Sequence, residues 1–210
     1  MTIRPGDEWG RLVARPDGLV SVANDREVVE ALHRRPASPV EVASGDLART
    51  LGVGASPDAS GGRVARNMVN EMPIDLVEVS LDGGEPVVAC AHVVARSPWY
   101  RGHWLRGPIL AVMNAEFIGQ WDVAPRGHPN DGRVEVVEVE PAMPLRHRVA
   151  ARRRLRSATH LPHPDISTRS VRTHEWSFPQ ALDVIVDGRR VGRASSVSVR
   201  VVADAAVVYA

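Results

Sequence analysis

The chain has 210 residues, of which 44% are hydrophobic, so it can form one domain or two small ones with a real core. Its 26 basic and 25 acidic side chains nearly cancel, which argues against a nucleic-acid partner. Every basic residue counted there is arginine, and this excludes a lysine phosphate clamp, a Schiff base and a lysine general base.

Cys90 is the single cysteine, so an internal disulfide and a cysteine metal cluster are both excluded. It stands within an apolar run, residues 87–91, and we expect a buried core residue there, not a nucleophile. The first residues contain no apolar run typical of a signal peptide, and no stretch approaches the roughly 20 apolar residues of a membrane span. We therefore expect a soluble, cytoplasmic protein.

The first third of the chain predicts a small α/β layer. A β-branched run at residues 18–23 predicts a strand, and a helix is expected over residues 26–34, with Asp25 as its N-cap. A second strand follows at residues 39–42, and Ser44 or Asp46 would cap a short helix that ends at Gly52. Residues 1–53 are therefore predicted to form a shortened α/β lobe.

The next segment changes character. Residues 54–62 are rich in glycine and serine with an internal proline, a composition typical of a linker, which we extend to residue 74. From residue 75 onward hydrophobic residues alternate with a period of two, which is typical of half-buried strands. Strands are expected at residues 75–81, 86–95, 109–114, 133–140, 170–175, 181–186 and 197–208, with one helix at residues 145–158.

Short strands broken by glycine and proline favour an antiparallel sandwich. We assign residues 75–195 to this β-sandwich domain, and residues 196–210 to a strand that returns toward the first lobe. The predicted fold class is α+β, with a truncated α/β lobe beside the sandwich.

The order of motifs in the second part of the chain is specific. Asn114 and Gly119 stand in Asn-Ala-Glu-Phe-Ile-Gly, residues 125–132 read Pro-Arg-Gly-His-Pro-Asn-Asp-Gly, and residues 183–188 read Asp-Val-Ile-Val-Asp-Gly. This series resembles the C-terminal domain of the diacylglycerol kinase family, which includes bacterial lipid kinases and sphingosine kinases. The resemblance covers residues 75–208 well and residues 20–52 loosely.

In the first lobe, residues 46–52 (Asp-Leu-Ala-Arg-Thr-Leu-Gly) are similar to the family segment G-T-x-N-D-x-A-R-x-L-G. The resemblance implies binding of ATP and Mg²⁺, and it places Asp46, Arg49, Asn114 and Gly119 on the cofactor side. A capped amphipathic turn would explain the same residues in the first lobe without any cofactor.

The family's phosphate-binding loop, G-G-D-G-T, is absent. Residues 23–26, Ala-Asn-Asp-Arg, stand in its place, and without glycine a close approach of backbone to phosphate is sterically doubtful. Asp25 corresponds to the aspartate of that loop, which makes it a candidate catalytic residue, although helix capping explains it equally well.

A second departure lies at residues 184–189, Val-Ile-Val-Asp-Gly-Arg, which resemble V-x-V-D-G-E. The resemblance implicates the last glutamate in catalysis, but here the position is Arg189, which can be neither a base nor a Mg²⁺ ligand. Asp187 remains as a second catalytic candidate, and Asp-Gly is also a common hairpin turn.

The resemblance also implies a structural Mg²⁺ in the loop at residues 125–132. Asp131, with Asp122, would supply the metal ligands, but they offer few oxygens for a hard cation. An Asx turn at residues 130–132 is the alternative. His128, His160 and His163 are expected to pack in loops and not to bind zinc.

The predicted helix at residues 145–158 carries six arginines: Arg146, Arg148, Arg152, Arg153, Arg154 and Arg156. Such a face can lie on anionic phospholipid, with Arg152, Arg153 and Arg156 as the lipid-surface candidates. The alternative is a solvated helix face paired with the glutamates of residues 133–140.

Three functions remain open on the sequence. The first is a degenerate lipid-kinase homologue that lacks efficient phosphoryl transfer and binds a lipid, a nucleotide or a protein partner. The second is an active or repurposed enzyme in which Asp25, Asp46 and Asp131 supply carboxylates. The third is one half of a split kinase whose other lobe is a separate chain. A sheet edge exposed by the shortened lobe would favour a homodimer.

Overall fold

The computed structural model describes residues 9–36, 38–53 and 67–210, so the glycine-rich segment and most of the expected linker lie outside the described residues. The elements in chain order are β1 (Arg11–Ala14), β2 (Val20–Val22), α1 (Asp25–Arg34), β3 (Val40–Val42), α2 (Asp46–Thr50), β4 (Met68–Leu81), β5 (Val87–Ala89), β6 (His92–Arg96), η2 (Trp99–Arg101), β7 (Ile109–Met113), β8 (Phe117–Ile118), β9 (Trp121–Asp122), β10 (Val134–Val139), α3 (Leu145–Arg154), η3 (Leu155–Ser157), β11 (Ile166–Val171), β12 (Thr173–Val186) and β13 (Arg189–Tyr209).

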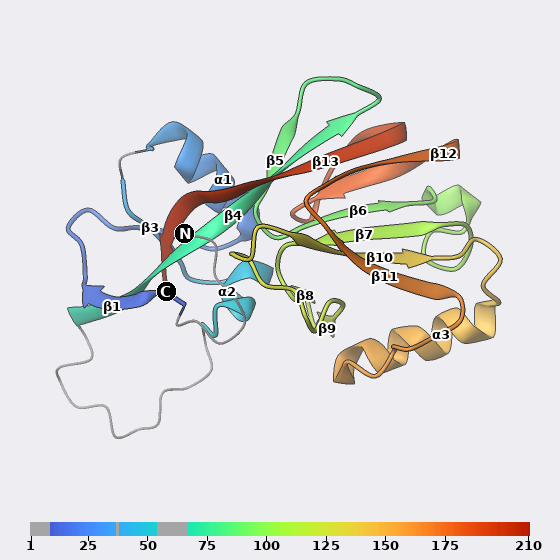
Figure 1. The fold of residues 1–210 in the computed structure, drawn as a ribbon, viewed down its shortest axis with the longest axis horizontal. Coiled ribbons are helices and arrows are strands. Elements are labelled where there is room, and N and C mark those ends of the chain that lie inside the picture. The colour runs from blue at the N-terminus through green and yellow to red at the C-terminus, as the bar shows by residue number, and fades with distance from the viewer. Residues whose placement is uncertain (1–8, 37, 54–66) are drawn as a thin grey trace.

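A small α/β lobe occupies one end of the molecule (Figure 1). There β2 and β3 pair in parallel, α1 packs against both strands, and α2 packs against α1. Buried Val28, Val42 and Leu47 form the centre of this lobe's core, which continues into Met72 and Ile74 of β4. The lobe therefore shares its core with the neighbouring sheet.

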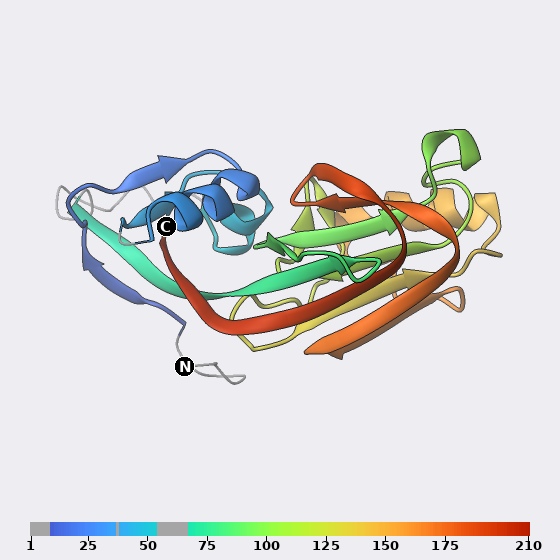
Figure 2. The same cartoon turned by 90° about the horizontal axis from the view of Figure 1, so that it is seen from above.

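Two long strands connect the lobe with the rest of the sheet. β4 and β13 run antiparallel to each other over most of their length, and the end of β13 reaches the lobe, where Tyr209 pairs in parallel with Glu41 (Figure 2). β4 begins at Met68, earlier than the strand that the alternation from residue 75 predicts. Residues 68–74 are strand and not linker, because Met72 and Ile74 of this segment are buried in the lobe's core.

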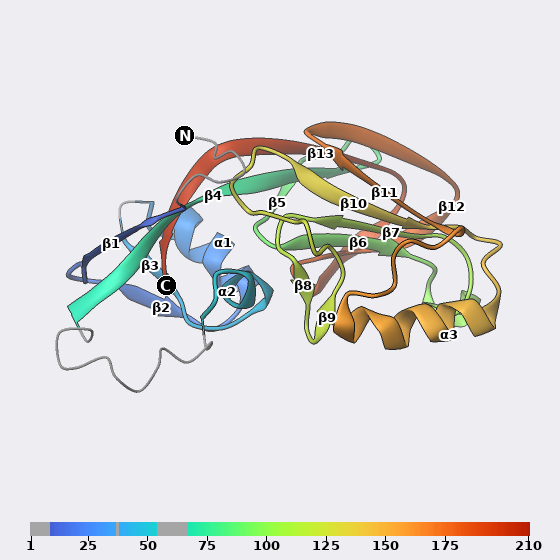
Figure 3. The ribbon, with the colours of Figure 1, turned by 60° about the horizontal axis from the view of Figure 1, so that its bottom comes forward.

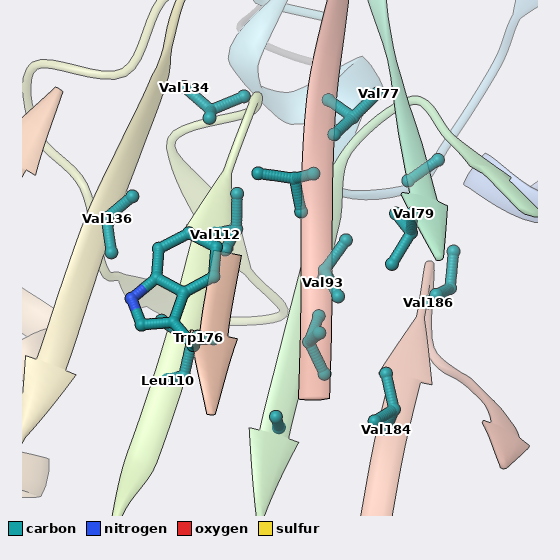
Figure 4. Packing of buried hydrophobic residues seen from close by; sticks show 14 of the residues in the cluster. Val77, Val79, Val93, Leu110, Val112, Val134, Val136, Trp176, Val184 and Val186 are labelled. Carbon is teal, nitrogen blue, oxygen red and sulfur yellow. The ribbon is translucent and has the colours of Figure 1, made fainter. Parts of the chain in front are cut away.

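Together with β4 and β13, the strands of the sandwich form an antiparallel sheet in the order β1-β4-β13-β12-β6-β7-β10-β11, with β5 beside β4, whereas β8 and β9 pair only with each other. β12 joins the two layers of the sandwich: its first residues pair only with β13, whereas Asp183–Val186 pair with both β13 and β6. One face of each strand points inward and builds an aliphatic core, in which the Trp176 ring lies among Leu110, Val112 and Val136 (Figure 4). The α+β class predicted from the sequence is confirmed.

The outer face of β6, β7 and β10 is also apolar, and α3 covers it (Figure 3). Met113 and Val137 of the sheet face this side, and Ala151 of α3 and Leu155 of η3 pack toward them, together with Trp121 of the β8–β9 hairpin. Within the part of the chain that the structure describes, no helix is both long and apolar enough to cross a bilayer.

Candidate functional site

The start of α1, where the resemblance places a phosphate loop, is closed by its own side chains. Asn24, and not Asp25, is the N-cap: its side chain accepts a hydrogen bond from the amide of Glu27 at 3.0 Å. The Glu27 carboxylate in turn accepts from the amide of Ala23, the residue before the N-cap, at 2.8 Å. The amides of Ala23 and Glu27 are therefore already hydrogen-bonded within the chain.

Asp25 caps a different helix. It is 6% exposed, and its two carboxylate oxygens accept hydrogen bonds from the amides of Asp46 and Leu47, at the start of α2, each at 2.9 Å. Burial raises the pKa of Asp25 above its usual value, and these two amides oppose the increase. Gly45 precedes α2 with φ of +120°, and a Cβ at this position would collide with the Asp25 carboxylate. The prediction that Asp25 caps its own helix is therefore wrong, because a local pattern cannot reveal an acceptor brought from a neighbouring element.

Three of the four residues expected on the cofactor side meet at the tip of the β8–β9 hairpin. The Asp46 carboxylate accepts from the amide of Gly119 at 2.6 Å, and the Arg49 guanidinium donates to the carbonyl of Gly119 at 2.6 Å. Arg49 also lies over the Phe117 ring, 4.1 Å from its centroid. In this structure Asp46 and Arg49 bind the hairpin, so these side chains connect α2 of the small lobe to the β8–β9 hairpin.

Asn114 and Asp187 organise the segment between β5 and β6. The buried Asn114 amide donates to the carbonyls of Cys90 and Asp75, at 2.7 and 3.0 Å. Asp187 accepts from the amides of Cys90, Ala91 and His92 at 2.9–3.0 Å. Both Asp187 and Gly188 have positive φ, which is the tight hairpin turn that the Asp-Gly pair predicts.

Cys90 is fully buried, as its apolar surroundings predict, and its thiol lies 3.2 Å from the carbonyl of Asp25. Burial raises the pKa of this thiol well above its usual value, and the nearby carboxylates of Asp187 and Asp25 add to the effect. A thiol in this environment stays protonated and is a core residue, not a nucleophile. The chain thus places Asp25, Asp46, Asn114 and Asp187 around Cys90, at a place that we call the lobe junction.

A small hollow of about 270 Å³ lies beside the lobe junction. Asp187 and Arg189 line it from the sandwich, and Arg26, Glu30 and His33 line it from α1. Arg189 is exposed, and its guanidinium occupies the position where the resemblance requires a carboxylate. A cation at this position cannot take a proton from an acceptor hydroxyl.

The two residues proposed as metal ligands lie in separate surroundings. Asp131 accepts a hydrogen bond from the amide of Arg133 at 2.9 Å, in the Asx turn that was the alternative to a metal loop. Burial raises its pKa, and nearby Asp75 adds to this. Burial also raises the pKa of Asp122, whose charged neighbours are different ones: Glu116, His160 and Arg49. Among the described residues, two groups could hold a metal ion, and neither contains Asp122 or Asp131.

A cavity of about 580 Å³ lies between α3 and the outer face of the sheet, and we call it the α3 cavity. Ala111 and Val137 belong to its floor, Ala151 and Leu155 to its cover, and Trp121 to its side. Its walls are mostly aliphatic and aromatic, and its volume lies within the roughly 300–1,000 Å³ typical of small-molecule sites. This arrangement can bury an apolar chain.

Arginines surround this cavity. Arg148, Arg152, Arg153 and Arg156 belong to its lining, and Arg152 lies over the Trp121 ring at 5.0 Å. The expected pairing with glutamates is not seen: among the described residues, no ion pair joins the arginines of α3 and η3 to a carboxylate. The lipid-surface candidates Arg152, Arg153 and Arg156 are exposed, so their charges can bind an external anion.

Arg148 differs from the others because it is 6% exposed. Its guanidinium donates to five main-chain carbonyls, those of Trp104, Gly107, Glu140, Pro141 and Met143, at 2.6–3.4 Å. It thereby ties α3 to the loop between β6 and β7. Arg148 is a positioning residue for the cover of the α3 cavity.

His160 brings a polar group to the cavity wall. It is 2% exposed, and neither ring nitrogen has a hydrogen-bond partner. Burial lowers its pKa, while the nearby carbonyl of Val123 and the carboxylate of Asp122 oppose this. Burial raises the pKa of Glu116, and the neighbouring Asp122 raises it further. His160, expected to pack in a loop, thus supplies a buried polar ring to an otherwise apolar space.

The loop beside the α3 cavity exposes further apolar side chains. Trp99 is 79% exposed and Tyr100 54%. Leu105 of the same loop and Val149 of α3 are partly exposed, and these two side chains line the cavity. Sequence reasoning missed this loop and the tryptophans that line the cavity. The available signal was the cluster of aromatic and basic residues from Trp99 to Arg106, a composition typical of membrane interfaces.

No protein-family model matches the sequence, and no curated protein matches it significantly. Solved structures, in contrast, share the fold. A diacylglycerol kinase from Bacillus anthracis str. Sterne superposes with a TM-score of 0.61 at 13% identity, over 91% of this chain and 75% of that one. Two other structures described as diacylglycerol kinases of the same strain have TM-scores of 0.63 at 12% and 13% identity, covering 91% of this chain and 77% of theirs. At such identities the similarity establishes a shared fold and not a shared activity.

Proposed function

We propose that this chain, which has the fold of diacylglycerol kinases, binds an anionic lipid and lacks efficient ATP-dependent phosphoryl transfer. The lipid chain would enter the α3 cavity, and the headgroup would stay at its arginine-lined rim. The observation that carries the proposal is the combination of an apolar cavity of about 580 Å³ with Arg152, Arg153 and Arg156 around it.

The apolar walls supply the affinity. Each methylene that leaves water contributes about 0.8 kcal/mol, so a chain that fills the cavity gains several kcal/mol before its ordering costs. His160 is the unsatisfied polar group on the wall, which suits a ligand with a hydroxyl or carbonyl oxygen near its headgroup.

The arginines supply the preference for an anion. Guanidinium groups bind phosphate and carboxylate oxygens in a bidentate manner, and no carboxylate of the described chain forms an ion pair with those of Arg152, Arg153 and Arg156. Leu105 lines the cavity, and the exposed Trp99 belongs to the same loop; both are suited to rest in the interfacial region of a membrane, so that lipid could pass directly into the cavity.

Two features argue against phosphoryl transfer. Residues 23–26 include no glycine, and the amides of Ala23 and Glu27 are hydrogen-bonded by the side chains of Glu27 and Asn24, so this segment is poorly suited to the triphosphate of ATP in the position the resemblance implies. Arg189 replaces the carboxylate implicated near the acceptor hydroxyl. We therefore route no reaction step through ATP or Mg²⁺.

The second candidate is a residual or altered enzyme, and one observation favours it. Asp25, Asp46 and Asp187 converge at the lobe junction, close enough that the latter two raise the pKa of Asp25 in addition to the effect of its burial. A carboxyl group whose pKa is raised by burial and by neighbouring carboxylates is typical of catalytic sites.

Two measurements on the purified protein test the proposal. We expect saturable binding of a fluorescent 16-carbon fatty acid, displaced by phosphatidic acid more effectively than by phosphatidylcholine. We also expect no transfer of the γ-phosphate of ATP to diacylglycerol in mixed micelles above a protein-free blank. Absence of saturable binding would refute the lipid site, and transfer that disappears in Asp25→Asn would establish the second candidate instead.

A further inference from the structure

The lobe junction contains a second kind of chemistry. Asp25 of α1, Asp46 of α2 and His92 of β6 each direct a ligand atom to one place, and these atoms lie within 4.8 Å of one another. His92 Nδ1 is 3.5 Å from Asp46 Oδ2. Asp25 and His92 are 6% and 4% exposed, so the group is shielded from solvent.

The His92 side chain lacks a hydrogen bond at this place. Its Nδ1 is buried and has no hydrogen-bond partner, which is rare for a polar atom in a folded protein. Its position is fixed, because its own amide donates to Asp187 at 2.9 Å. The imidazole is therefore held with an unsatisfied nitrogen directed at two carboxylates.

The carboxylates have coordination capacity left. Asp46 Oδ1 accepts the amide of Gly119, which leaves Oδ2 toward His92. Each oxygen of Asp25 accepts one amide, and a carboxylate oxygen has two lone pairs.

We infer that Asp25, Asp46 and His92 form a binding site for a divalent first-row transition-metal ion, such as Zn²⁺ or Mn²⁺. One imidazole with two carboxylates suits these ions, whereas Mg²⁺ prefers oxygen ligands and retains its water. Two ligands about 2.1 Å from a tetrahedral ion stand roughly 3.4 Å apart, which matches the distance between His92 and Asp46. The ion would join the two helices of the small lobe to the sandwich.

Metal-free protein prepared with a chelator provides the test, by titration with Zn²⁺, Mn²⁺ and Mg²⁺ separately. The matched control is His163→Ala, which removes the second group of metal-binding type, His147, His163 and Asp165, and leaves the junction intact. We expect His163→Ala to retain one tightly bound Zn²⁺ and a rise in Tm on metal addition. Mg²⁺ should produce neither effect.

Two variants remove one ligand each. Asp46→Asn keeps an oxygen that can accept the amide of Gly119, and His92→Asn keeps a polar side chain, so both can fold. Each should weaken Zn²⁺ binding by at least about 10-fold, and Co²⁺ bound to the parent should show visible absorption bands that His92→Asn alters. Zn²⁺ binding that is unchanged in both variants, or lost in His163→Ala, would overturn the inference, and so would a parent protein that binds no Zn²⁺.

Discussion

Ala151 and Ala150 are neighbours on α3, but only Ala151 faces the α3 cavity, whereas Ala150 is exposed to solvent. Ala151→Phe places a ring in the space that we assign to a lipid chain. We expect it to weaken the binding of a 16-carbon fatty acid strongly, and Ala150→Phe, which makes the same chemical change one residue away, to leave binding unchanged.

The magnitude follows from the methylenes that the ring displaces. If the ring occupies the space of about four methylenes, each contributing about 0.8 kcal/mol, the loss is about 3 kcal/mol, or roughly 200-fold in Kd. A 10-carbon ligand leaves more of the cavity free, and should therefore lose less affinity than the 16-carbon ligand. The unfolding free energy should stay equal or increase, because the ring adds buried apolar area.

Fluorescence titration of both variants with ligands of two lengths measures this difference, and urea unfolding confirms that each variant is folded. Equal Kd values for Ala151→Phe and the parent, with both proteins folded, would refute the assignment of the cavity to the lipid chain. The same conclusion would follow if Ala150→Phe lost as much affinity as Ala151→Phe.

Three further outcomes concern stability. Arg148→Met removes the donor to five carbonyls and should lower the unfolding free energy, measured by urea denaturation, by about 2–4 kcal/mol. Arg146 is exposed, so Arg146→Met should be nearly neutral, and equal effects of the two substitutions would contradict the positioning role of Arg148. Asn24→Ala removes the cap of α1 and should lower the unfolding free energy by about 1 kcal/mol, and an unchanged unfolding free energy would show that the Asn24 cap is unimportant. Burial lowers the pKa of His160, so below about 6.5 the unfolded chain binds more protons than the folded one, and stability should fall as pH falls through this window. His160→Asn should flatten that decline in urea midpoints, and an unchanged slope would show that other groups cause it.

Local patterns predicted the elements of the fold well. The alternation of hydrophobic residues predicted the antiparallel strands, and the Asp187–Gly188 pair predicted the turn between β12 and β13. The arginine-rich segment predicted a helix, observed as α3 and η3. These features depend on residues near one another in the chain, so a sequence displays them directly.

Contacts between distant segments were not predictable in the same way. Asp25 caps a helix about 20 residues further along, and Asp187 binds the amides of residues about 97 positions earlier. His92 carried no signal, since a single histidine beside an apolar strand indicates nothing about the carboxylates that the fold brings to it. The α3 cavity likewise depends on how far a helix stands from a sheet, which hydrophobic periodicity does not reveal.

The ribbon formed by β4 and β13 couples the unfolding of the two regions of the chain. Both strands belong to the lobe's core and to the sandwich. Unfolding of either region therefore disrupts the hydrogen bonds between β4 and β13 on which the other depends. The register changes between Val202 and Ala206, where the buried Asp75 carboxylate accepts the amide of Asp204 at 2.8 Å and fastens the irregularity to its neighbours. The chain should thus unfold as one cooperative unit. A lobe encoded by a separate chain could replace the small lobe only if it also replaced the lobe's part of β4 and β13.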